Sequence, residues 1–443
     1  MKLNTQRTVL VGFAFLSICA FWQMYDNLVP LMLTNTFHVN ETFSGAIMAA
    51  DNVLALFLLP LFGGLSDKCK NKLGRRRPFI LIGTLMAVAL MIGIPLINDS
   101  YYAAPSSGKL IAFIVLLGLL LVSMATYRSP AVALMPDVTP KPLRSKANAI
   151  INLMGAVGGV IYLLITSVLY QTKPGSNEHI SYVPLFLIVG GIMLTALVVL
   201  LLFVNEPKLC AEQAEYEKAH PEQNLAQTNE NSKTEELPAD VKRSLSFLLV
   251  SIALWFIGYN AITTWFTTYA QNVWNMSLGN ASLCLTVATV GAILSYIPVG
   301  NIASKVGRKK TISFGVVLLA SSFFAAFLYT LVSDQFSPLL YVLFVLVGVA
   351  WASINVNSLP MVVEMCKGSD VGKFTGLYYT FSMSAQTITP IVAGFLLNQV
   401  SYQALFPYAA FFVACAFVTM SFVKHGDNKV EAKKGLEAFD IED

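Results

Sequence analysis

The sequence predicts an all-α membrane protein with twelve transmembrane helices arranged as two six-helix, pseudo-symmetric halves. Of its 443 residues, 56% are hydrophobic and 12% are charged, whereas a soluble domain carries about 25% charged residues. Hydrophobic runs of about 20 residues, the length that spans a bilayer, recur along the whole chain. Short motifs of the first half also reappear in the second. This composition excludes a soluble enzyme, a disordered protein and a nucleic-acid-binding protein.

Hydrophobic runs separated by polar breaks give the predicted spans. In chain order they cover residues 9–32, 43–65, 78–97, 110–135, 148–170, 182–204, 245–270, 283–302, 311–333, 338–361, 374–397 and 405–423. The first run resembles a signal peptide, but the eleven spans that follow favour an uncleaved helix. The polar residues 205–243 are rich in Glu, Lys, Gln and Asn. We therefore predict an N-terminal bundle (1–204), a cytoplasmic linker (205–243), a C-terminal bundle (244–423) and a cytoplasmic tail (424–443).

Basic residues give the expected orientation. If the N terminus lies inside, nearly all of the 29 Lys and Arg fall in cytoplasmic loops. The exceptions are Lys109, Lys173 and Arg128. An excess of Lys and Arg marks the cytoplasmic side of a membrane protein. We therefore expect a multi-pass protein of the cell membrane with both termini in the cytoplasm.

The two halves share motifs at a constant spacing. Tyr25–Asn27 aligns with Gly258–Asn260, and Gly74–Arg76 aligns with Gly307–Lys309 at the same offset. An even number of spans in each half makes the two repeats parallel, related by an axis along the membrane normal. Such repeats are typical of transporters, in which the substrate binds near the middle of the membrane.

The loop after the second predicted span carries a recognisable signature. It reads GLSDKCKNKLGRRRPFI from Gly64 to Ile80, and a weaker copy reads GNIASKVGRKK from Gly300 to Lys310. These sequences resemble the paired signature loops of the major facilitator superfamily. The first is also similar to the loop of sucrose:proton symporters and of the glycoside-pentoside-hexuronide:cation symporter group. The resemblance implies the major facilitator fold and proton-coupled symport of a sugar or glycoside by alternating access.

The same resemblance implies a gating role for this loop. The residues concerned are Gly64, Asp67, Gly74, Arg75, Arg76 and Arg77. In the family this loop ties helices together and stabilises one access state without contacting the substrate. The alternative is that its basic residues only fix the topology, as any cytoplasmic loop does.

Ionisable residues within the spans are candidates for proton coupling, because a charge in hydrocarbon is costly. They are Asp26, Asp51, Arg128 and Asp137. Arg128 is expected to pair with an acid, and a structural ion pair is the alternative role. Asp137 follows Pro130 as the proton-coupling aspartate does in the fourth helix of the sucrose symporters. Counting residues along the span instead places Asp137 at the cytoplasmic rim, where a helix cap is the alternative.

Neutral polar and aromatic residues are expected to bind the substrate. Amides hydrogen-bond to sugar hydroxyls, and aromatic rings cover the apolar face of a sugar. The candidates are Gln23, Asn27, Tyr127, Asn152, Tyr259, Asn260, Trp351, Asn355 and Gln386. Helix packing is the alternative role for each aromatic residue.

The sequence offers nothing typical of an enzyme, a metal site or a cofactor site. Its six cysteines lie far apart, without metal-ligand spacing, and are expected to be free thiols. The expected partners are a small polar solute, protons and the lipid bilayer, and we expect a monomer that binds no nucleic acid. Two alternatives stay open: an exporter of drugs or other organic solutes in the same fold, and a non-transporting membrane sensor.

Overall fold

A computed structural model describes residues 3–140, 143–171, 179–219, 237–365 and 371–427. Within these residues twelve helices are long and hydrophobic enough to cross a membrane. The described part of the chain contains no β-strand. The predicted all-α fold with twelve spans is therefore confirmed.

The helices follow the hydrophobic runs of the sequence. The first six spans are α1 (Thr5–Leu31, continued by the π-helix η1, Met32–Thr36), α2 (Glu41–Asp67), α3 (Arg77–Ala103), α4 (Ser107–Asp137), α5 (Arg144–Leu169) and α6 (Val183–Phe203). The last six are α9 (Ala239–Val273), α10 (Leu278–Val306), α11 (Arg308–Val332), α12 (Leu339–Glu364), α13 (Val371–Gln399) and α14 (Leu405–Ser421), the last preceded by the short turn η3 (Tyr402–Ala404). The polar helix α7 (Glu206–Ala219) follows α6.

Most helices run beyond their predicted ends. Helix α9, for example, has 35 residues, whereas about 20 suffice to cross the hydrocarbon layer. Its first turn contains Asp240, Lys242 and Arg243, which a hydropathy pattern assigns to the linker. These polar turns continue the helix past the hydrophobic segment.

The chain forms two compact units. The first comprises Met1–Val39, Ala50–Thr166 and Gly175–Ala226; the second comprises Asn40–Ala49, Ser167–Pro174 and Gln227–Asp443. The first turns of α2 and the last residues of α5 therefore belong to the second unit. The boundaries predicted at residues 204 and 244 stay a prediction.

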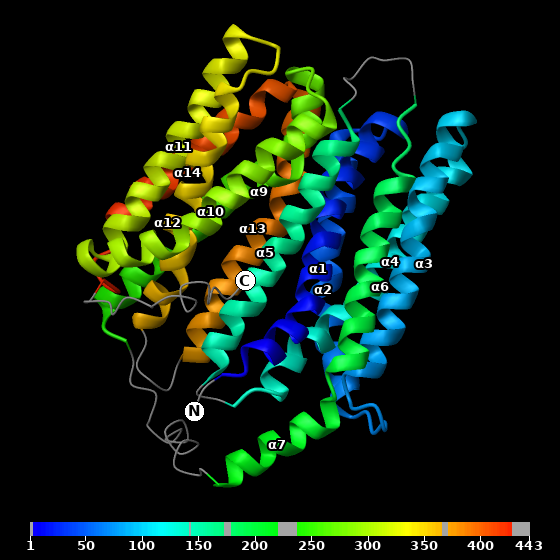
Figure 1. Cartoon of the computed structure of the whole chain (residues 1–443). Helices are drawn as coiled ribbons and strands as arrows, with labels where there is room; N and C mark the ends of the chain where they lie inside the picture. The colour runs from blue at the N-terminus through cyan, green and yellow to red at the C-terminus, as the bar shows by residue number, and fades with distance from the viewer. Residues whose placement is uncertain (1–2, 141–142, 172–178, 220–236, 366–370, 428–443) are drawn as a thin grey trace. The chain divides into compact units, whose positions relative to one another are not determined.

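In the first unit, α3 packs against α4 and α6, and α1 packs against the same two helices (Figure 1). Glycines allow two of the closest approaches. A Cβ at Gly83 would lie 2.7 Å from the backbone nitrogen of Tyr127, and a Cβ at Gly158 would lie 2.0 Å from the carbonyl oxygen of Leu16. These contacts bring α3 against α4 and α5 against α1.

In the second unit, α12 packs between α10 and α11, and α9 packs against α13 and α14 (Figure 1). One buried cluster of aromatic residues holds α9, α11 and α14 together. The Thr330 hydroxyl group hydrogen-bonds to the hydroxyl group of Tyr269 at 2.6 Å and accepts a bond from Nε1 of Trp274 at 3.1 Å. Phe406 of α14 packs on both rings.

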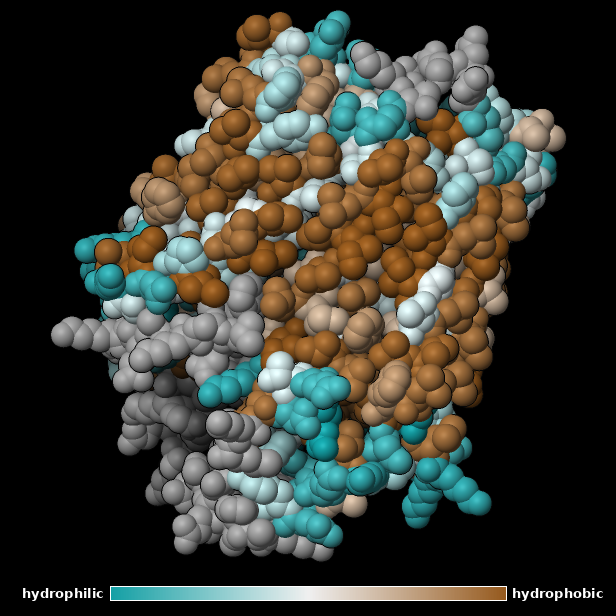
Figure 2. Space-filling view, in the orientation of Figure 1, coloured by the Kyte–Doolittle hydropathy of each residue, from teal (hydrophilic) through white to brown (hydrophobic). Residues whose placement is uncertain are grey.

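The surface matches a bilayer environment. Hydrophobic side chains cover the middle of the helices in view, and hydrophilic ones gather toward the helix ends (Figure 2). Large apolar side chains such as Phe57 and Leu294 are about 70% exposed. Such faces are stable only against lipid, so the hydrophobic surface supports the assignment as a multi-pass membrane protein.

Candidate functional site

Three charged residues of the first unit lie close together. Asp26 is on α1, Asp51 on α2 and Arg128 on α4, and each is half-buried. The charges of Asp51 and Arg128 both act on Asp26, and the charge of Arg128 acts on Asp51. The guanidinium carbon of Arg128 lies 5.7 Å from the centre of the Trp22 ring, within cation–π range. We call Asp26, Asp51 and Arg128 the charged triad.

Unpartnered hydrogen-bond donors lie beside the charged triad. The hydroxyl group of Tyr25 is buried and has no hydrogen-bond partner among the described residues, although the charges of Asp51 and Asp26 both act on it. Nε1 of Trp22 is likewise buried and unpartnered within the part of the chain that the structure describes. Leaving such a group unpaired costs about 1–3 kcal/mol. These donors are therefore available to a bound ligand or water.

Two members of the charged triad, Asp51 and Arg128, border a small pocket. A small pocket within the first unit is lined by Trp22, Asp51 and Arg128 together with apolar residues of α2 and α4. A purely structural ion pair is normally packed and hydrogen-bonded on all sides. The small pocket beside Asp51 and Arg128 instead favours a role in binding.

Two substrate candidates of the first unit are engaged in helix contacts. The Tyr127 hydroxyl group hydrogen-bonds to Oγ of Ser17 at 2.5 Å and donates to the carbonyl oxygen of Ala14 at 3.0 Å. Nδ2 of Asn27 donates to the carbonyl oxygen of Gln23 at 2.5 Å. Both side chains are at most 2% exposed. Tyr127 therefore fastens α4 to α1 in this structure.

The other two candidates of the first unit remain half-buried. Gln23 faces α5, where a Cβ at Gly159 would lie 3.5 Å from its Oε1. Asn152 lies on α5 and is half-buried. Gln23 directly follows Trp22, which lines the pocket beside the charged triad. In sequence, Gln23 is therefore closer to a pocket residue than Asn152 is.

The second unit holds a neutral aromatic surface. The rings of Tyr259 and Trp351 stack in parallel with centroids 3.6 Å apart, and Phe256 meets Trp351 edge-on at 5.3 Å. Asn260 directly follows Tyr259 in sequence. Its Nδ2 is buried and has no hydrogen-bond partner among the described residues. An unpaired amide and flat aromatic rings are the two kinds of group that contact a sugar ring.

The remaining candidates of the second unit lie on α12 and α13. Asn355 is 9% exposed, and Gln386 is half-buried. The hydroxyl group of Ser358 bonds to the hydroxyl group of Tyr378 at 3.3 Å and to the carbonyl oxygen of Asn355 at 3.3 Å. The bond to Tyr378 connects α12 to α13, and the bond to Asn355 lies within α12.

Arg76 is the buried centre of an ion-pair cluster in the gating loop. Its Nε donates to Oδ2 of Asp137 at 2.8 Å, and its other nitrogens bond to Asp67 and Ser66. Arg75 bonds to Oδ1 of Asp137 at 2.8 Å. The Arg76 side chain is 6% exposed, whereas those of Arg75 and Asp67 are 42% and 55% exposed, so the cluster is buried around Arg76 and open to solvent at its edge. The structure thus brings Asp137 to the gating loop and leaves it apart from the charged triad.

Glu206 joins the gating loop to α7. Its carboxylate accepts hydrogen bonds from the backbone N–H groups of Arg75, Arg76 and Arg77 at 2.8 to 3.1 Å. Glu206 is 1% exposed. A carboxylate at this place satisfies the free N–H groups at the start of α3 and interacts favourably with the helix dipole.

The two signature glycines differ in their surroundings. Gly74 has φ +109°, and a Cβ there would lie 2.3 Å from Oε2 of Glu206. Gly64 lies within α2, and a Cβ there would meet nothing within 4 Å. Only position 74 requires glycine, both for its backbone conformation and for the close carboxylate.

The second unit repeats this arrangement. Gly307 has φ +100°, and a Cβ there would lie 2.8 Å from Oδ1 of Asp427. That oxygen accepts a hydrogen bond from the backbone N–H of Lys309 at 3.2 Å. Arg308 forms a salt bridge with Glu364 at the end of α12, just as Arg75, its counterpart in the first half, pairs with Asp137 at the end of α4. Both signature loops therefore rest on a carboxylate that follows the sixth helix of its half.

Cys210 lies against the same cluster, with Sγ 3.6 Å from the carbonyl oxygen of Asp137. Burial, followed by the charges of Glu206 and Asp137, raises the pKa of the Cys210 thiol to about 11. This thiol is protonated at neutral pH and serves packing rather than nucleophilic chemistry. Among the described residues no group of three or more His, Cys, Asp or Glu is placed to hold a metal ion. Cys366 lies outside the described residues.

The family model described as Major Facilitator Superfamily matches residues 11–282 and 271–440. The chain belongs to the major facilitator superfamily. Members of this superfamily are membrane transporters rather than enzymes, and the twelve hydrophobic helices agree with that assignment.

Three relatives within the superfamily match parts of the chain. Sucrose transport protein SUC3 of Arabidopsis thaliana is 32% identical over 138 residues, which cover 28% of this chain and 23% of that protein. Sucrose transport protein SUT4 of Oryza sativa subsp. indica is 30% identical over 170 residues, 36% of this chain and 28% of that protein. Uncharacterized protein YqgE of Bacillus subtilis (strain 168) is 28% identical over 198 residues, 43% of this chain and 44% of that protein. Each match spans less than half of the relative's length.

Solved structures share the fold over nearly the whole chain. A mutant of the nucleoside transporter NupG has a TM-score of 0.65 at 15% identity, with 94% of this chain and 100% of that chain covered. The xylose transporter XylE from E. coli has a TM-score of 0.64 at 13% identity, with 95% of this chain and 99% of that chain covered. At such identities the likeness establishes the major facilitator fold alone.

Some residues of the site are not apparent from sequence patterns. Glu206 and Asp427 look like solvated linker and tail residues, and only their shared position after the sixth span of each half singles them out. Phe256 lies one helical turn before Tyr259 on the same face, and this spacing could have identified it. Tyr25 directly precedes Asp26, but nothing in the sequence indicates that its hydroxyl group is unpaired.

Proposed function

We propose that the chain is a secondary active transporter that carries a sugar or glycoside together with protons by alternating access. The observation that carries the proposal is the charged triad beside the unpartnered hydroxyl group of Tyr25 in the described part of the first unit. Ionisable residues at membrane depth typically mark substrate or ion pathways. The similarity to two sucrose transport proteins supports a sugar as the substrate.

Charge counting explains how the triad would couple a proton. With both carboxylates ionised and Arg128 charged, the triad carries one net negative charge. Binding of a single proton to Asp26 or Asp51 makes it neutral. Because net charge is costly within the hydrocarbon layer, the helices that carry the triad rearrange more readily when one proton is bound. Arg128 keeps the second carboxylate ionised and oriented.

The second unit would supply the main sugar contacts. Tyr259 and Trp351 present flat ring faces, and the amide of Asn260 can donate to a hydroxyl group. Tyr127, which bonds to α1, would position α4 rather than bind sugar directly, and the amide of Asn27 bonds to the backbone of its own helix. The further candidates for contact with the substrate are Gln23, Asn152, Asn355 and Gln386.

The gating cluster would set the stability of one access state. Arg76 connects α2 through Asp67 and α4 through Asp137, while Glu206 connects the loop to α7. Breaking this cluster changes the relative stability of the two access states without altering the substrate contacts. We place the cluster and both termini on the cytoplasmic side of the cell membrane, in a monomeric carrier.

Uptake into proteoliposomes tests the proposal. An imposed pH gradient should drive accumulation of labelled disaccharide by the wild-type chain. Asp26→Asn and Asp51→Asn should each abolish accumulation but preserve exchange of sugar across the membrane, because exchange needs no net proton movement. Asp334→Asn, at an exposed position, is the matched control and should leave accumulation unchanged.

Three outcomes contradict the proposal. Accumulation that ignores the pH gradient removes proton coupling, and unchanged accumulation in both aspartate variants removes the triad. Extrusion of an organic solute without any sugar movement would instead identify an exporter.

A further inference from the structure

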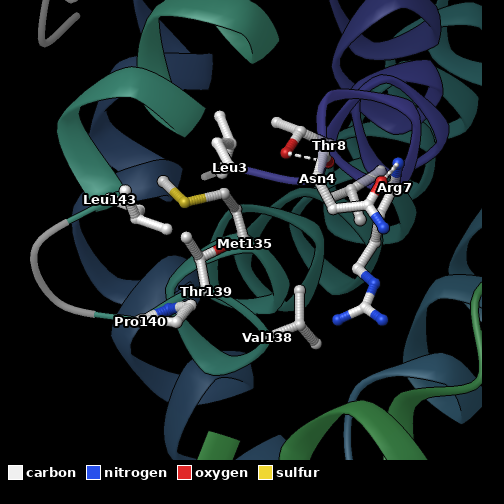
Figure 3. A pocket seen from close by; sticks show the side chains of 10 residues that line it. Leu3, Asn4, Arg7, Thr8, Met135, Val138, Thr139, Pro140 and Leu143 are labelled. Carbon is white, nitrogen blue, oxygen red and sulfur yellow. Dashed lines mark hydrogen bonds between the residues drawn. The ribbon is translucent and has the colours of Figure 1, made fainter. Parts of the chain in front are cut away.

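The first unit contains a pocket that the proposed transport cycle does not use. The pocket lies between the start of α1, the end of α4 and the segment that follows α4. Side chains from all three point into a common space (Figure 3). The lining residues fall within Leu3–Val11, Met135–Pro140 and Leu143. The cavity measures about 70 Å³, which is room for only a short stretch of an acyl chain.

This pocket is apolar inside and polar at its mouth. Val11, Met135, Val138 and Leu143 form its walls and are each at most 8% exposed. Arg7 is the one ionisable residue among the described residues that line it. An apolar interior with a single cation at the rim fits an amphiphile that carries a negative charge.

The charge of Arg7 is accessible to a ligand. Its Nη2 bonds to Oε2 of Glu212 on α7 at 3.1 Å, and the two side chains are 36% and 43% exposed. Exposed ion pairs contribute little to stability. A phosphate group, with more acceptor oxygens than a carboxylate, is therefore able to replace Glu212 as the partner of Arg7.

We infer that this pocket binds an acidic phospholipid of the surrounding bilayer. The phosphate group bonds to Arg7, and part of one acyl chain lies among Val11, Met135 and Leu143. Acidic lipids bind characteristically at basic pockets between transmembrane helices. The bilayer that surrounds the chain supplies this ligand at high local concentration.

Lipid binding would act on α7. Helix α7 is attached to α1 through Glu212 and Arg7, and to the gating loop through Glu206. A phosphate group at Arg7 releases the first attachment and leaves the second. The pocket also includes Val138, directly after Asp137 of the gating cluster. Any effect on transport rests on the proposed function, whereas lipid binding itself does not.

Lipid affinity measured by native mass spectrometry tests the inference on the purified full chain. The probes are phosphatidylglycerol and phosphatidylcholine with identical acyl chains. We expect wild type to prefer phosphatidylglycerol about tenfold, the effect of roughly one charge-assisted hydrogen bond. Arg7→Gln should remove this preference, whereas Glu212→Gln should strengthen phosphatidylglycerol binding because it removes the competing carboxylate.

The opposite effects of these two variants separate a lipid site from a structural ion pair. If the pair only attaches α7, both variants destabilise the protein alike and neither changes the lipid preference, which overturns the inference. Equal affinity of wild type for the two lipids also overturns it.

A pocket-filling variant tests the acyl-chain contact. Val138→Phe and Leu143→Phe should each weaken phosphatidylglycerol binding with Arg7 intact, whereas Val198→Phe, at an exposed site on α6, should not. Glycerol 3-phosphate, which lacks acyl chains, should bind far more weakly than phosphatidylglycerol. Equally strong binding of glycerol 3-phosphate, or normal lipid binding to both filled variants, contradicts the inference. Transport is not measured, so failure here differs from failure of the proposed function.

Discussion

Replacing Gly74 by alanine tests how the gating loop is built. The residue has φ +109°, and a methyl group there would lie 2.3 Å from Oε2 of Glu206. A non-glycine residue in such a backbone conformation costs on the order of 1–3 kcal/mol. Displacing the Glu206 carboxylate from the start of α3 costs roughly 0.5–2 kcal/mol more, as for other helix caps. Gly74→Ala should therefore reduce the free energy of unfolding by about 1.5–5 kcal/mol.

Gly64→Ala is the matched control, because the same methyl group meets nothing within 4 Å at that position. It lies within α2, where alanine is about 1 kcal/mol more favourable than glycine, so its stability should be unchanged or higher. Unfolding of each purified variant in detergent, followed by circular dichroism against temperature, measures the difference.

A double-mutant cycle separates the two causes of the effect. If the methyl group acts through Glu206, the combined loss in Gly74→Ala with Glu206→Ala should be smaller than the sum of the single losses, by about 1 kcal/mol. Strict additivity would show that backbone strain alone is responsible. Equal stability of the Gly74 and Gly64 variants would refute the reasoning altogether.

Three further predictions concern other parts of the chain. Gly45→Ala would place a methyl group 2.1 Å from the carbonyl oxygen of Pro390 within the second unit. It should therefore separate α2 from α13 at a cost of about 1–3 kcal/mol and raise the rate of amide hydrogen exchange at this contact. An unchanged exchange rate would contradict the contact. Trp351→Ala removes the ring stacked on Tyr259 and should weaken sugar binding by about tenfold, measured by isothermal titration, whereas an unchanged affinity would exclude this surface from the site. Because burial raises the pKa of Cys210 to about 11, maleimide labelling of this thiol should be slow at pH 7 and increase about tenfold per pH unit up to that value. Fast labelling at pH 7 would contradict the raised pKa of this half-buried thiol.

The fold could be predicted from the sequence because span formation is a local property. A run of about 20 apolar residues must hydrogen-bond its own backbone within lipid, so each run becomes a helix regardless of its neighbours. Helix ends were less predictable. The first turn of α9, with Asp240 and Lys242, is polar yet helical, because helices do not end where the hydrocarbon layer does.

The candidate site could be predicted only as separate residues. Asp26, Asp51 and Arg128 stand out because charges are rare within spans, but which of them meet depends on helix packing. Asp137 illustrates the difference, because the turn that ends α4 places it against Arg76. The sequence alone supported a coupling role and a rim position equally.

Buried contacts made by polar loop residues were beyond sequence reasoning. Glu206 reads as a solvated residue of the linker, yet it is 1% exposed and caps α3. Tyr127 lies at a depth that suits a substrate-binding aromatic residue, and only its bonds to Ser17 and Ala14 indicate a packing role. Hydropathy reports the average environment of a segment and carries no information on the direction of one side chain.

Sugar-driven proton movement tests the central claim most directly. Proteoliposomes containing the full chain and an internal pH dye are mixed with disaccharide in the absence of any imposed gradient. The account predicts that sugar addition acidifies the interior of wild-type vesicles, and that Asp26→Asn and Asp51→Asn vesicles show no acidification. Entry of sugar without any change in internal pH would contradict proton coupling by the charged triad.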